Sequence, residues 1–438
     1  MHRLLRLSLV LPLGLLACCA DAHRLRVAGS AADAGRDALR DAGERERCRP
    51  RPVRPLTRLA RNVIVFMGDG MGPVQLSTAR YAKDGPLRID ELLGPALADT
   101  DSLTTLEASD PELSPTDSAA AASVIATGTR VHNYALSVTA DGDALETVLE
   151  LCKRAGKATG LVTTSYFFDA SPAAFASHQA SRDWYDLIAH QMLTETQPDV
   201  IMGSGSQLFD DARLGLPAVA AAAGYEVLRG VPALMAWDPA REPRVLGLFE
   251  TDFQPQVLAD EHFTMTPALE RRADSPDPTL ATMVGRALDH LARDQDGFFL
   301  FAEDEILDQM GHRGPAEVDW SNRAYPAQAA ALDDAIGVAL DWVDGHSSFS
   351  ETLIVVLADH ETGGYRYDPA LGPGSGHFGA VGQGSLALAG NHTRTPTAVY
   401  ALGPGSEALE HVRAHADTHA LLVGELGVAC DEHHCDAD

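Results

Sequence analysis

Short runs of apolar residues alternate with helix-like segments along the chain from Asn62 onward. Residues 279–293 form one of the helix-like segments. The apolar runs are too short for helices, and we predict strands at residues 62–67, 158–164, 298–302, 353–357 and 397–402. Because these runs are continuously apolar, both faces of each strand should be buried. The pattern therefore predicts an α/β fold with a central, largely parallel β-sheet and helices on both faces.

Acidic residues closely follow several of the predicted strands. They are Asp69, Asp169, Glu303 and Asp359. In open α/β sheets, ligands bind at the carboxyl ends of the strands, so these carboxylates should meet there. They would repel one another unless cations lay between them. Capping of the following helices accounts for one or two of these positions, but not for all of them together with the nearby histidines.

Acid and imidazole side chains are paired in two segments. Asp308 and His312 are four residues apart and share a face if that stretch is helical. Asp359 and His360 follow a predicted strand, where neighbours in a turn can reach the same ion. His392, just before the last strand, is the remaining imidazole candidate. Each pair alone is weak evidence, but carboxylate and imidazole are the ligands of zinc in hydrolytic sites.

Residues 115–122 (PTDSAAAA) combine a capping signal with a strong helix former. Either Thr116 or Asp117 can cap the helix, which places Ser118 in its first turn. Free N–H groups and the helix dipole favour an anion at that position. From this segment alone, Ser118 is either a nucleophile or another capping residue.

Composition excludes some classes of protein. Hydrophobic residues make up 45% of the 438 residues, which is incompatible with global disorder. The formal charge of −28, from 62 acidic and 34 basic residues, disfavours binding to nucleic acid, so we expect none.

Residues 1–22 are predicted to be a signal peptide. A basic start precedes an apolar run at residues 7–16 that is too short to span a bilayer. Residues 15–18 (LLAC) resemble a bacterial lipobox, which predicts cleavage before Cys18 and a lipid anchor on it. Simple cleavage after residues 20–22 (ADA) is the alternative. Both readings predict an exported protein, either free in the periplasm or anchored to the membrane as a lipoprotein.

The remaining chain is predicted to consist of a tether and one catalytic domain. Residues 23–58 are rich in Arg, Asp, Ala and Pro without a sustained period, which is typical of a flexible tether, and residues 59–438 form the domain. Export permits disulfides. The sequence does not determine the pairing of the remaining cysteines, which are Cys48, Cys152, Cys430 and Cys435.

Six segments resemble the alkaline phosphatase family in sequence, order and approximate spacing. They are NVIVFMGDGMG, PTDSAAAASVIATGTRVHN, GLVTTSYFFDASPAAFASHQASR, FFLFAEDEILDQMGH, VVLADHETGG and HTRTPTAVYALGPG. With weaker likeness between them, the resemblance covers about residues 62–404. It implies an alkaline phosphatase-like fold that hydrolyses phosphate monoesters through a phosphoseryl intermediate, releasing inorganic phosphate and an alcohol.

The resemblance also implies two zinc ions, one magnesium ion and a set of site residues. The positions that match the first zinc site are Asp308, His312 and His392. Those that match the second zinc site are Asp69, Asp359 and His360. Those that match the magnesium site are Asp69, Ser171 and Glu303, with Asp169 acting through water. The nucleophile, the phosphate-binding arginine and the carboxylate that orients it match Ser118, Arg182 and Asp117.

The chain departs from the family pattern at two places. Gln309 stands where relatives often carry Lys, His or Trp, so Asp169 has no such cation at that position, and we expect product phosphate to be held less tightly. Only 31 residues separate His360 from His392, which leaves little room for the crown-like insertion of some relatives. A homodimer would therefore need another interface.

Two alternative functions share parts of this pattern. A superfamily enzyme acting on phosphodiesters or sulfate esters would use the same two-metal core. Against a sulfatase, residues 48–52 (CRPRP) carry Pro52 where the Cys-x-Pro-x-Arg motif requires arginine. The other alternative is a non-enzymatic lipoprotein that binds phosphate or metal, although every matched position carries a chemically competent residue.

Overall fold

The computed structural model describes residues 60–83, 85–241, 244–249, 265, 268, 275, 277–312, 324–365 and 391–426. Contacts divide the chain into residues 1–55 and 56–438, and all described residues belong to the second unit. The predicted leader and tether lie outside the described residues, as do Cys18, Cys48, Cys430 and Cys435.

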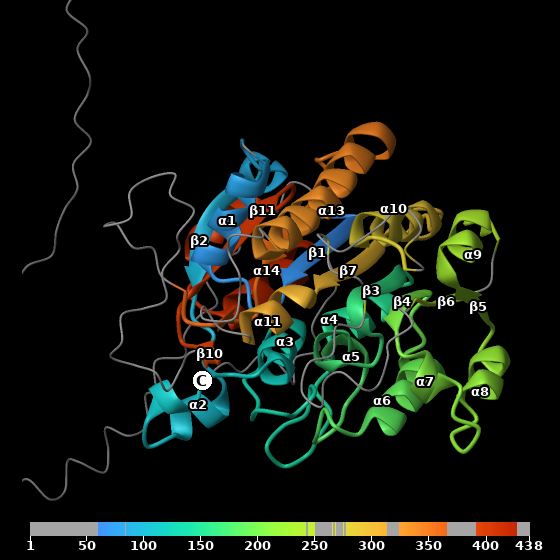
Figure 1. The fold of residues 1–438 in the computed structure, drawn as a ribbon, viewed down its shortest axis with the longest axis horizontal. Coiled ribbons are helices and arrows are strands. Elements are labelled where there is room, and N and C mark those ends of the chain that lie inside the picture. The colour runs from blue at the N-terminus through green and yellow to red at the C-terminus, as the bar shows by residue number, and fades with distance from the viewer. Residues whose placement is uncertain are drawn as a thin grey trace, which may run out of the picture. The chain divides into compact units, whose positions relative to one another are not determined.

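A nine-stranded mixed sheet forms the centre of this unit (Figure 1). In spatial order its strands are β2 (Leu93–Ala98), β11 (Thr397–Leu402), β8 (Thr352–Leu357), β1 (Asn62–Gly68), β7 (Phe298–Asp304), β3 (Ala158–Tyr166), β4 (Val200–Ser204), β6 (Arg244–Leu248) and β5 (Tyr225–Arg229). Strand β11 is antiparallel to both neighbours, and every other pairing is parallel. The predicted, largely parallel α/β sheet is confirmed, and the five predicted strands correspond to β1, β3, β7, β8 and β11.

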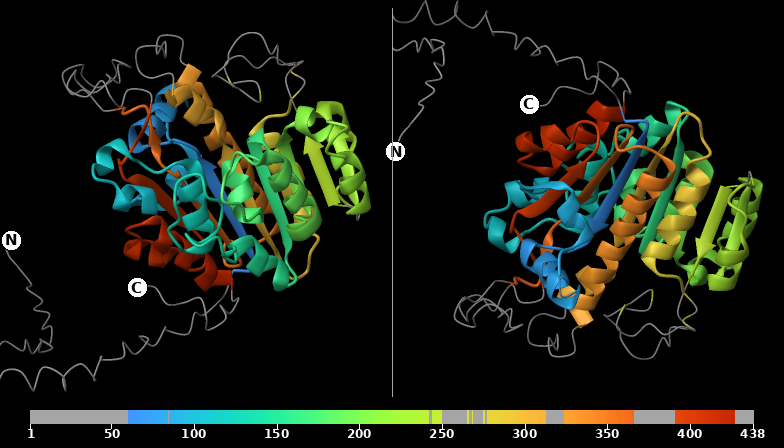
Figure 2. Two further views of the ribbon diagram at one scale, coloured as in Figure 1. Left: turned by 90° about the horizontal axis from the view of Figure 1, so that it is seen from below. Right: turned by 90° about the horizontal axis from the view of Figure 1, so that it is seen from above.

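Helices cover both faces of the sheet, as the two views of Figure 2 show. In β1, Val63, Val65 and Met67 face one core, and Ile64 and Phe66 face the other. The first core includes α3 (Ser118–Thr127), α4 (Val148–Arg154), α5 (Ala170–Ala176) and α14 (His415–Leu426). The second includes α1 (Pro73–Lys83), α10 (Leu280–Leu291), α11 (Ile306–His312) and α13 (Ala324–His346). Full burial of each of these β1 side chains contributes about 1.5–3 kcal/mol.

Shorter elements complete the unit. They are the helices α2 (Leu103–Glu107), α6 (Tyr185–Gln191), α7 (Ser206–Phe209), α8 (Leu216–Ala222) and α9 (Gly230–Ala236), the 3₁₀ helices η2 (Arg88–Glu91), η3 (Pro111–Leu113) and η7 (Ser406–His411), the π-helix η4 (Met192–Thr196), and a two-stranded sheet of β9 (Glu361–Thr362) and β10 (His392–Thr393). Among the described residues, no helix is both long and apolar enough to cross a membrane.

Helix α10 begins and ends close to its predicted bounds. The Thr279 hydroxyl accepts a hydrogen bond from the Thr282 N–H at 3.1 Å and so caps the helix. In α4, Cys152 is buried and has no disulfide partner within the described part of the chain. Burial raises the pKa of its thiol to about 12.

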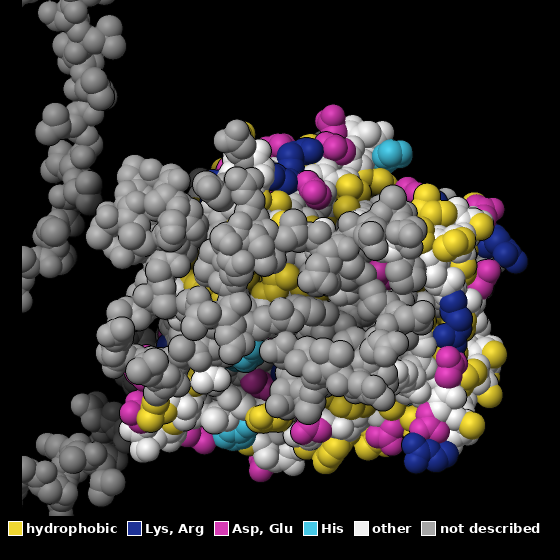
Figure 3. Space-filling model, in the orientation of Figure 1, with side chains coloured by type: hydrophobic (Ala, Val, Ile, Leu, Met, Phe, Trp, Pro, Cys, Tyr) yellow, Lys and Arg dark blue, Asp and Glu magenta, His cyan; other side chains and the backbone are white. Residues whose placement is uncertain are grey.

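On the face drawn in Figure 3, the Lys and Arg side chains of the described residues are dispersed among acidic and apolar ones. Among the described residues drawn there, the positive side chains therefore form no concentrated cluster.

The register of the central strands brings their carboxyl ends to one edge of the sheet. Met67 of β1 lies opposite Glu303 of β7 and Leu357 of β8, and Thr163 of β3 also lies opposite Glu303. The residues that follow these positions therefore converge, which places the predicted acids at a common edge.

Gly297, the residue before β7, allows a close approach between two segments. Its φ is +93°, and a Cβ atom there would lie 2.0 Å from the Arg61 carbonyl oxygen. Gly142 has a similar φ of +89°, but a Cβ atom there would meet nothing within 4 Å.

We expect Gly142→Ala to lower the free energy of unfolding by about 1–2 kcal/mol, and Gly297→Ala to lower it by several-fold more because the Arg61 backbone must move. Urea denaturation of both variants tests this, and equal losses would contradict the role of the close approach.

Candidate active site

The start of α3 lies at the centre of the predicted site. Asp117 caps the helix by accepting a hydrogen bond from the Ala120 N–H at 3.0 Å, which decides between the two predicted capping residues. Ser118 is the first residue of the helix and is 4% exposed. Its Oγ atom lies 3.2 Å from Nε2 of His360. The serine is therefore held at a buried helix N-terminus against an imidazole.

A first group of ligand-type side chains lies beside this helix. As predicted, α11 brings Asp308 and His312 together, with Oδ2 and Nε2 3.1 Å apart. His392 of β10 places its Nε2 atom 3.1 Å from His312 Nε2 and 3.7 Å from Asp308 Oδ1. The Nδ1 atom of His392 lies 2.8 Å from the Thr116 carbonyl oxygen. A hydrogen bond donated by Nδ1 to that carbonyl leaves the Nε2 lone pair directed at the group, which is the tautomer a metal ligand needs.

A second group follows β1 and β8 and is fully buried. His360 Nε2 lies 3.6 Å from Asp69 Oδ1 and 3.1 Å from Asp359 Oδ2. Asp359 Oδ1 accepts hydrogen bonds from the backbone N–H groups of Gly70 and His360, at 3.0 and 2.9 Å. The rings of His360 and His392 stack with centroids 3.6 Å apart, so the two groups are adjacent.

Two sets of potential ligand atoms each lie within 4.8 Å of one another. One set is Asp69, Asp359 and His360, and the other is Asp308, His360 and His392. The first set matches the predicted second zinc site. In the other set His360 takes the place of His312, because the His360 ring lies between the two groups.

A third group contains oxygen atoms alone. Glu303 Oε2 accepts a hydrogen bond from the Thr163 hydroxyl at 2.6 Å. Glu303 Oε1 and Ser171 Oγ are buried without a hydrogen bond of good geometry, as is Asp69 Oδ1. Buried oxygen atoms in this condition are costly unless a cation binds them. The donor set therefore fits oxygen-liganded cations such as magnesium.

Arg182 forms ion pairs with two of the predicted acids. Its Nη2 atom lies 3.0 Å from Asp169 Oδ1, and its Nη1 atom lies 3.5 Å from Asp117 Oδ2. Although burial lowers the pKa of the guanidinium, these two carboxylates raise it above its ordinary value, so Arg182 stays charged. Asp169 therefore has a basic partner in Arg182, which the loop after α5 returns to it, and not in residue 309.

Gln309 pairs with a neighbouring acid at the start of its own helix. Gln309 Nε2 donates a hydrogen bond to Glu305 Oε2 at 2.6 Å. Asp169 also accepts hydrogen bonds from the Ser165 hydroxyl, at Oδ2 and 2.5 Å, and from the Ala170 N–H, at Oδ1 and 2.7 Å.

Sequence reasoning missed Thr362, which bridges the first and second groups. Its hydroxyl donates a hydrogen bond to Asp308 Oδ1 and lies 3.1 Å from His360 Nδ1. Its position two residues after His360 was the available signal, because residues i and i+2 of an extended segment lie on one side.

Burial and like charges shift the titration of the carboxylates. Burial, with the charges of Asp359 and other nearby acids, raises the pKa of Asp69 well above its ordinary value. Burial also raises the pKa of Asp359 to about 7 and that of Glu303 to about 8. Burial acts in the same direction on Asp308, but the neighbouring imidazoles lower the pKa of that carboxyl below its usual range. A cluster of carboxylates with these shifts favours bound cations.

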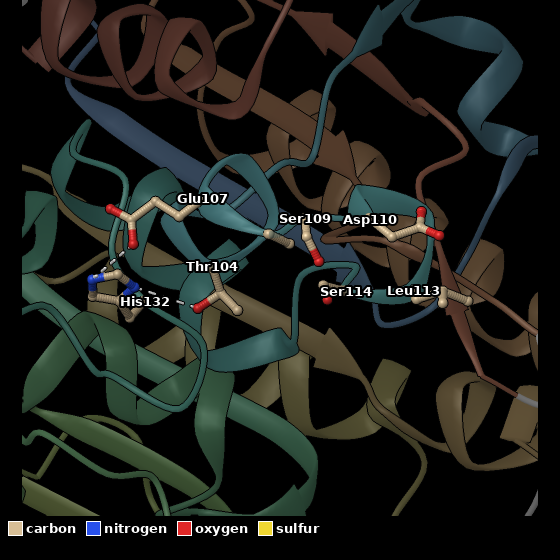
Figure 4. A pocket seen from close by; sticks show the side chains of 8 residues that line it. Thr104, Glu107, Ser109, Asp110, Leu113, Ser114 and His132 are labelled. Carbon is tan, nitrogen blue, oxygen red and sulfur yellow. Dashed lines mark hydrogen bonds and ion pairs between the residues drawn. The ribbon is translucent and has the colours of Figure 1, made fainter.

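The pockets of the described surface include one that contains none of the predicted site residues. A cavity of about 460 Å³ lies between α2, η3 and His132 (Figure 4). The His132 ring approaches Thr104 Oγ1 at 3.4 Å and Glu107 Oε2 at 3.9 Å. The chemistry therefore concentrates at the start of α3 and not in this cavity.

Comparison with known proteins places this geometry in a family. The family model described as alkaline phosphatase matches residues 60–424. Alkaline phosphatase 3 of Bacillus subtilis is 34% identical over 314 residues, which are 70% of this chain and 62% of that protein. The match thus spans less than two thirds of that relative's length. Streptomycin-6-phosphate phosphatase of Streptomyces griseus is 31% identical over 430 residues, covering 84% of this chain and 91% of that protein.

The fold is also similar to solved structures. The alkaline phosphatase of the Antarctic bacterium TAB5 superposes with a TM-score of 0.69 at 23% identity. The superposition covers 85% of this chain and 99% of that one. At this identity the likeness concerns the fold.

The raised carboxylate pKa values predict how the metal-free protein responds to pH. Glu303 and Asp359 keep their protons to a higher pH in the folded state than in the unfolded state. These two groups therefore lower the free energy of unfolding as the pH rises between about 4 and 8, by up to about 1.4 kcal/mol per pH unit for each group. Buried histidines such as His415 and His419, whose pKa burial lowers to about 4, act in the opposite direction below about pH 6.5. Urea denaturation in the presence of a chelator measures this slope. Glu303→Gln, which cannot ionise, should flatten it, and an unchanged slope would contradict the assignment.

Proposed function

The chain belongs to the alkaline phosphatase family, and on that premise we propose that it is an enzyme that hydrolyses phosphate monoesters through a phosphoseryl intermediate on Ser118. The products are inorganic phosphate and an alcohol. The observation that carries the proposal is the buried Ser118 hydroxyl at the start of α3, 3.2 Å from His360 Nε2 and next to the Asp117 that holds Arg182.

The helix start supplies positive potential where the phosphate must sit. Free N–H groups and the dipole of α3 favour an anion beside Ser118. Of the free N–H groups at this helix start, Asp117 accepts a hydrogen bond only from that of Ala120. Its other oxygen accepts a hydrogen bond from the Tyr134 N–H at 3.1 Å. Because phosphoryl transfer depends mainly on positioning and charge neutralisation, a nucleophile fixed at such a position fits the reaction.

Arg182 is the proposed phosphate-binding side chain. A guanidinium donates two parallel hydrogen bonds to phosphate oxygens, which an ammonium group cannot do. The ion pairs with Asp169 and Asp117 limit its rotation, so less conformational freedom is lost when substrate binds.

The proposed metal ligands follow the three groups. One zinc would be held by Asp308, His312 and His392, a second by Asp69, Asp359 and His360, and a magnesium ion by Asp69, Ser171 and Glu303, with Asp169 acting through water. When bound, such ions lower the pKa of nearby hydroxyl groups and neutralise developing negative charge. The donor sets support this division, because two groups mix imidazole with carboxylate and the third offers oxygen alone.

Location and assembly remain proposals from the sequence. The predicted leader supports export, and Cys18 is the proposed site of a lipid anchor. The sequence leaves the oligomeric state open, and a homodimer would need a surface other than a crown. The physiological alcohol is not specified by residues that contact only phosphate.

Replacing the nucleophile tests the reaction directly. We expect Ser118→Ala to lower turnover more than about a thousandfold while phosphate still binds, because the helix start and Arg182 are retained. The control is Ser77→Ala in α1, whose hydroxyl donates to the Val74 carbonyl at 2.6 Å, and it should keep full turnover. Protein quenched at low pH during turnover should carry phosphate on Ser118 by mass spectrometry, and phosphate on any other residue would refute the assignment. Comparison of a monoester with a diester and a sulfate ester separates the alternative activities.

Removal of metal tests the ligand assignment. A chelator should abolish turnover without loss of helical circular dichroism, and zinc together with magnesium should restore it. Elemental analysis should find zinc and magnesium in the active protein. Fully active protein without a bound transition metal would contradict the proposal, whereas a cobalt or manganese form would change only the identity of the metal.

A further inference from the structure

Tyr134 has an unusual backbone conformation for its residue type. Its φ is 70°, in the left-handed region that favours glycine and is costly for a bulky side chain. The side chain is 55% exposed, so burial of the ring does not offset that cost. Residues held in such conformations concentrate at functional sites, where the surrounding structure imposes them.

The backbone of Tyr134 is hydrogen-bonded to both Arg182, the proposed phosphate-binding residue, and Asp117, which orients it. Its N–H donates to Asp117 Oδ2 at 3.1 Å, and its carbonyl accepts a hydrogen bond from the Arg182 N–H at 2.8 Å. These two bonds account for the conformation of the residue. They also fix Tyr134 at the margin of the site, on the stretch that joins the cap of α3 to the arginine.

Exposed aromatic side chains are concentrated around Arg182. Among the described residues, the only exposed Phe, Tyr or Trp residues are Tyr134, Trp184 and Tyr185, at 55%, 45% and 37%. The last two follow Arg182 by two and three residues. The Tyr185 ring packs against Phe168 with centroids 5.5 Å apart, which limits its movement.

The titration of Tyr185 is consistent with this placement. Burial raises the pKa of its hydroxyl, the charge of Asp169 raises it further, and Arg182 opposes both. The ring therefore lies within the electrostatic field of the ion pair that orients the proposed phosphate-binding group.

We propose that Tyr134, together with Trp184 and Tyr185, forms an aromatic rim that binds the alcohol portion of the substrate. The preferred substrates are phosphate monoesters whose alcohol carries a planar ring, such as aryl, benzyl or nucleoside groups. Small alkyl phosphates are poorer substrates because they offer no face for stacking. This inference rests on the proposed function and names its substrate class. An exposed aromatic contact of this kind contributes a factor of about three to ten in binding.

Two matched phosphate esters separate the effect of a ring in the substrate's alcohol from the chemical reactivity of the ester. Benzyl phosphate and propyl phosphate both release primary alcohols, so the ratio of their kcat/KM values reports mainly on the alcohol portion. We expect the natural protein to favour benzyl phosphate about three- to tenfold. Tyr134→Gly and Tyr134→Asn both tolerate a positive φ and lack the ring, so each should bring the ratio towards one while leaving inhibition by inorganic phosphate unchanged. Met235→Ala on α9, which removes an exposed apolar side chain elsewhere, should keep the ratio.

Binding of non-hydrolysable analogues separates this inference from the proposed function. Calorimetric titration of the metal-loaded protein with benzylphosphonate and propylphosphonate should show the same ratio, and the same loss of it in both Tyr134 variants. Equal binding of the two phosphonates by the natural protein, or a ratio that persists in both variants, would overturn the aromatic rim. Absence of turnover with either ester would instead refute the proposed function, and the phosphonate ratio would still decide whether the rim exists.

Discussion

Burial of like charges is the constraint on which the site depends. The parallel order of β8, β1, β7 and β3 brings Asp69, Asp359 and Glu303 to one edge of the sheet, where each is almost fully buried. Removing a carboxylate from water costs several kcal/mol even after relaxation, and its neighbours add repulsion. A chain that places these acids together must supply compensating charge, and Arg182 and the proposed cations have that role.

Backbone and hydroxyl donors share in this compensation. Two backbone N–H groups hold Asp359, the Thr163 hydroxyl holds Glu303, and the Thr362 hydroxyl holds Asp308. Each donor binds one oxygen of its carboxylate, and the second oxygens of Asp359 and Glu303 are buried without a hydrogen bond of good geometry. A hydrogen bond to a charged group contributes about 1.5–3 kcal/mol, so these contacts both orient the carboxylates and partly offset their burial. The cluster is therefore arranged before any ligand arrives.

Much of the sheet was predictable because its central strands are continuously apolar. Strands β2, β4, β5 and β6 were not predicted. The sequence of β2, LGPALA, contains glycine and proline and its residues are mostly exposed, so it carries none of the usual signals of a strand. The acids that end the central strands were also predictable, since position after a strand places a side chain at the sheet edge. Their hydrogen-bond partners were not. The pairing of Arg182 with Asp169 depends on the path of the loop after α5, which a local pattern does not specify.

The sequence separation of the contacting residues has a consequence for the way this centre forms. Ser118 and His360 are 242 residues apart, and Thr116 and His392 are 276 apart. Contacts between such distant segments form only after the large loops between them have closed, and these closures slow folding. No single segment of the nascent chain can form the active site, because the site combines residues near the start of the domain, such as Ser118, with residues near its end, such as His392. Metal capture and the catalytic arrangement should thus belong to the completed fold, and a chain truncated before β10 would present the serine without the imidazole that Thr116 orients.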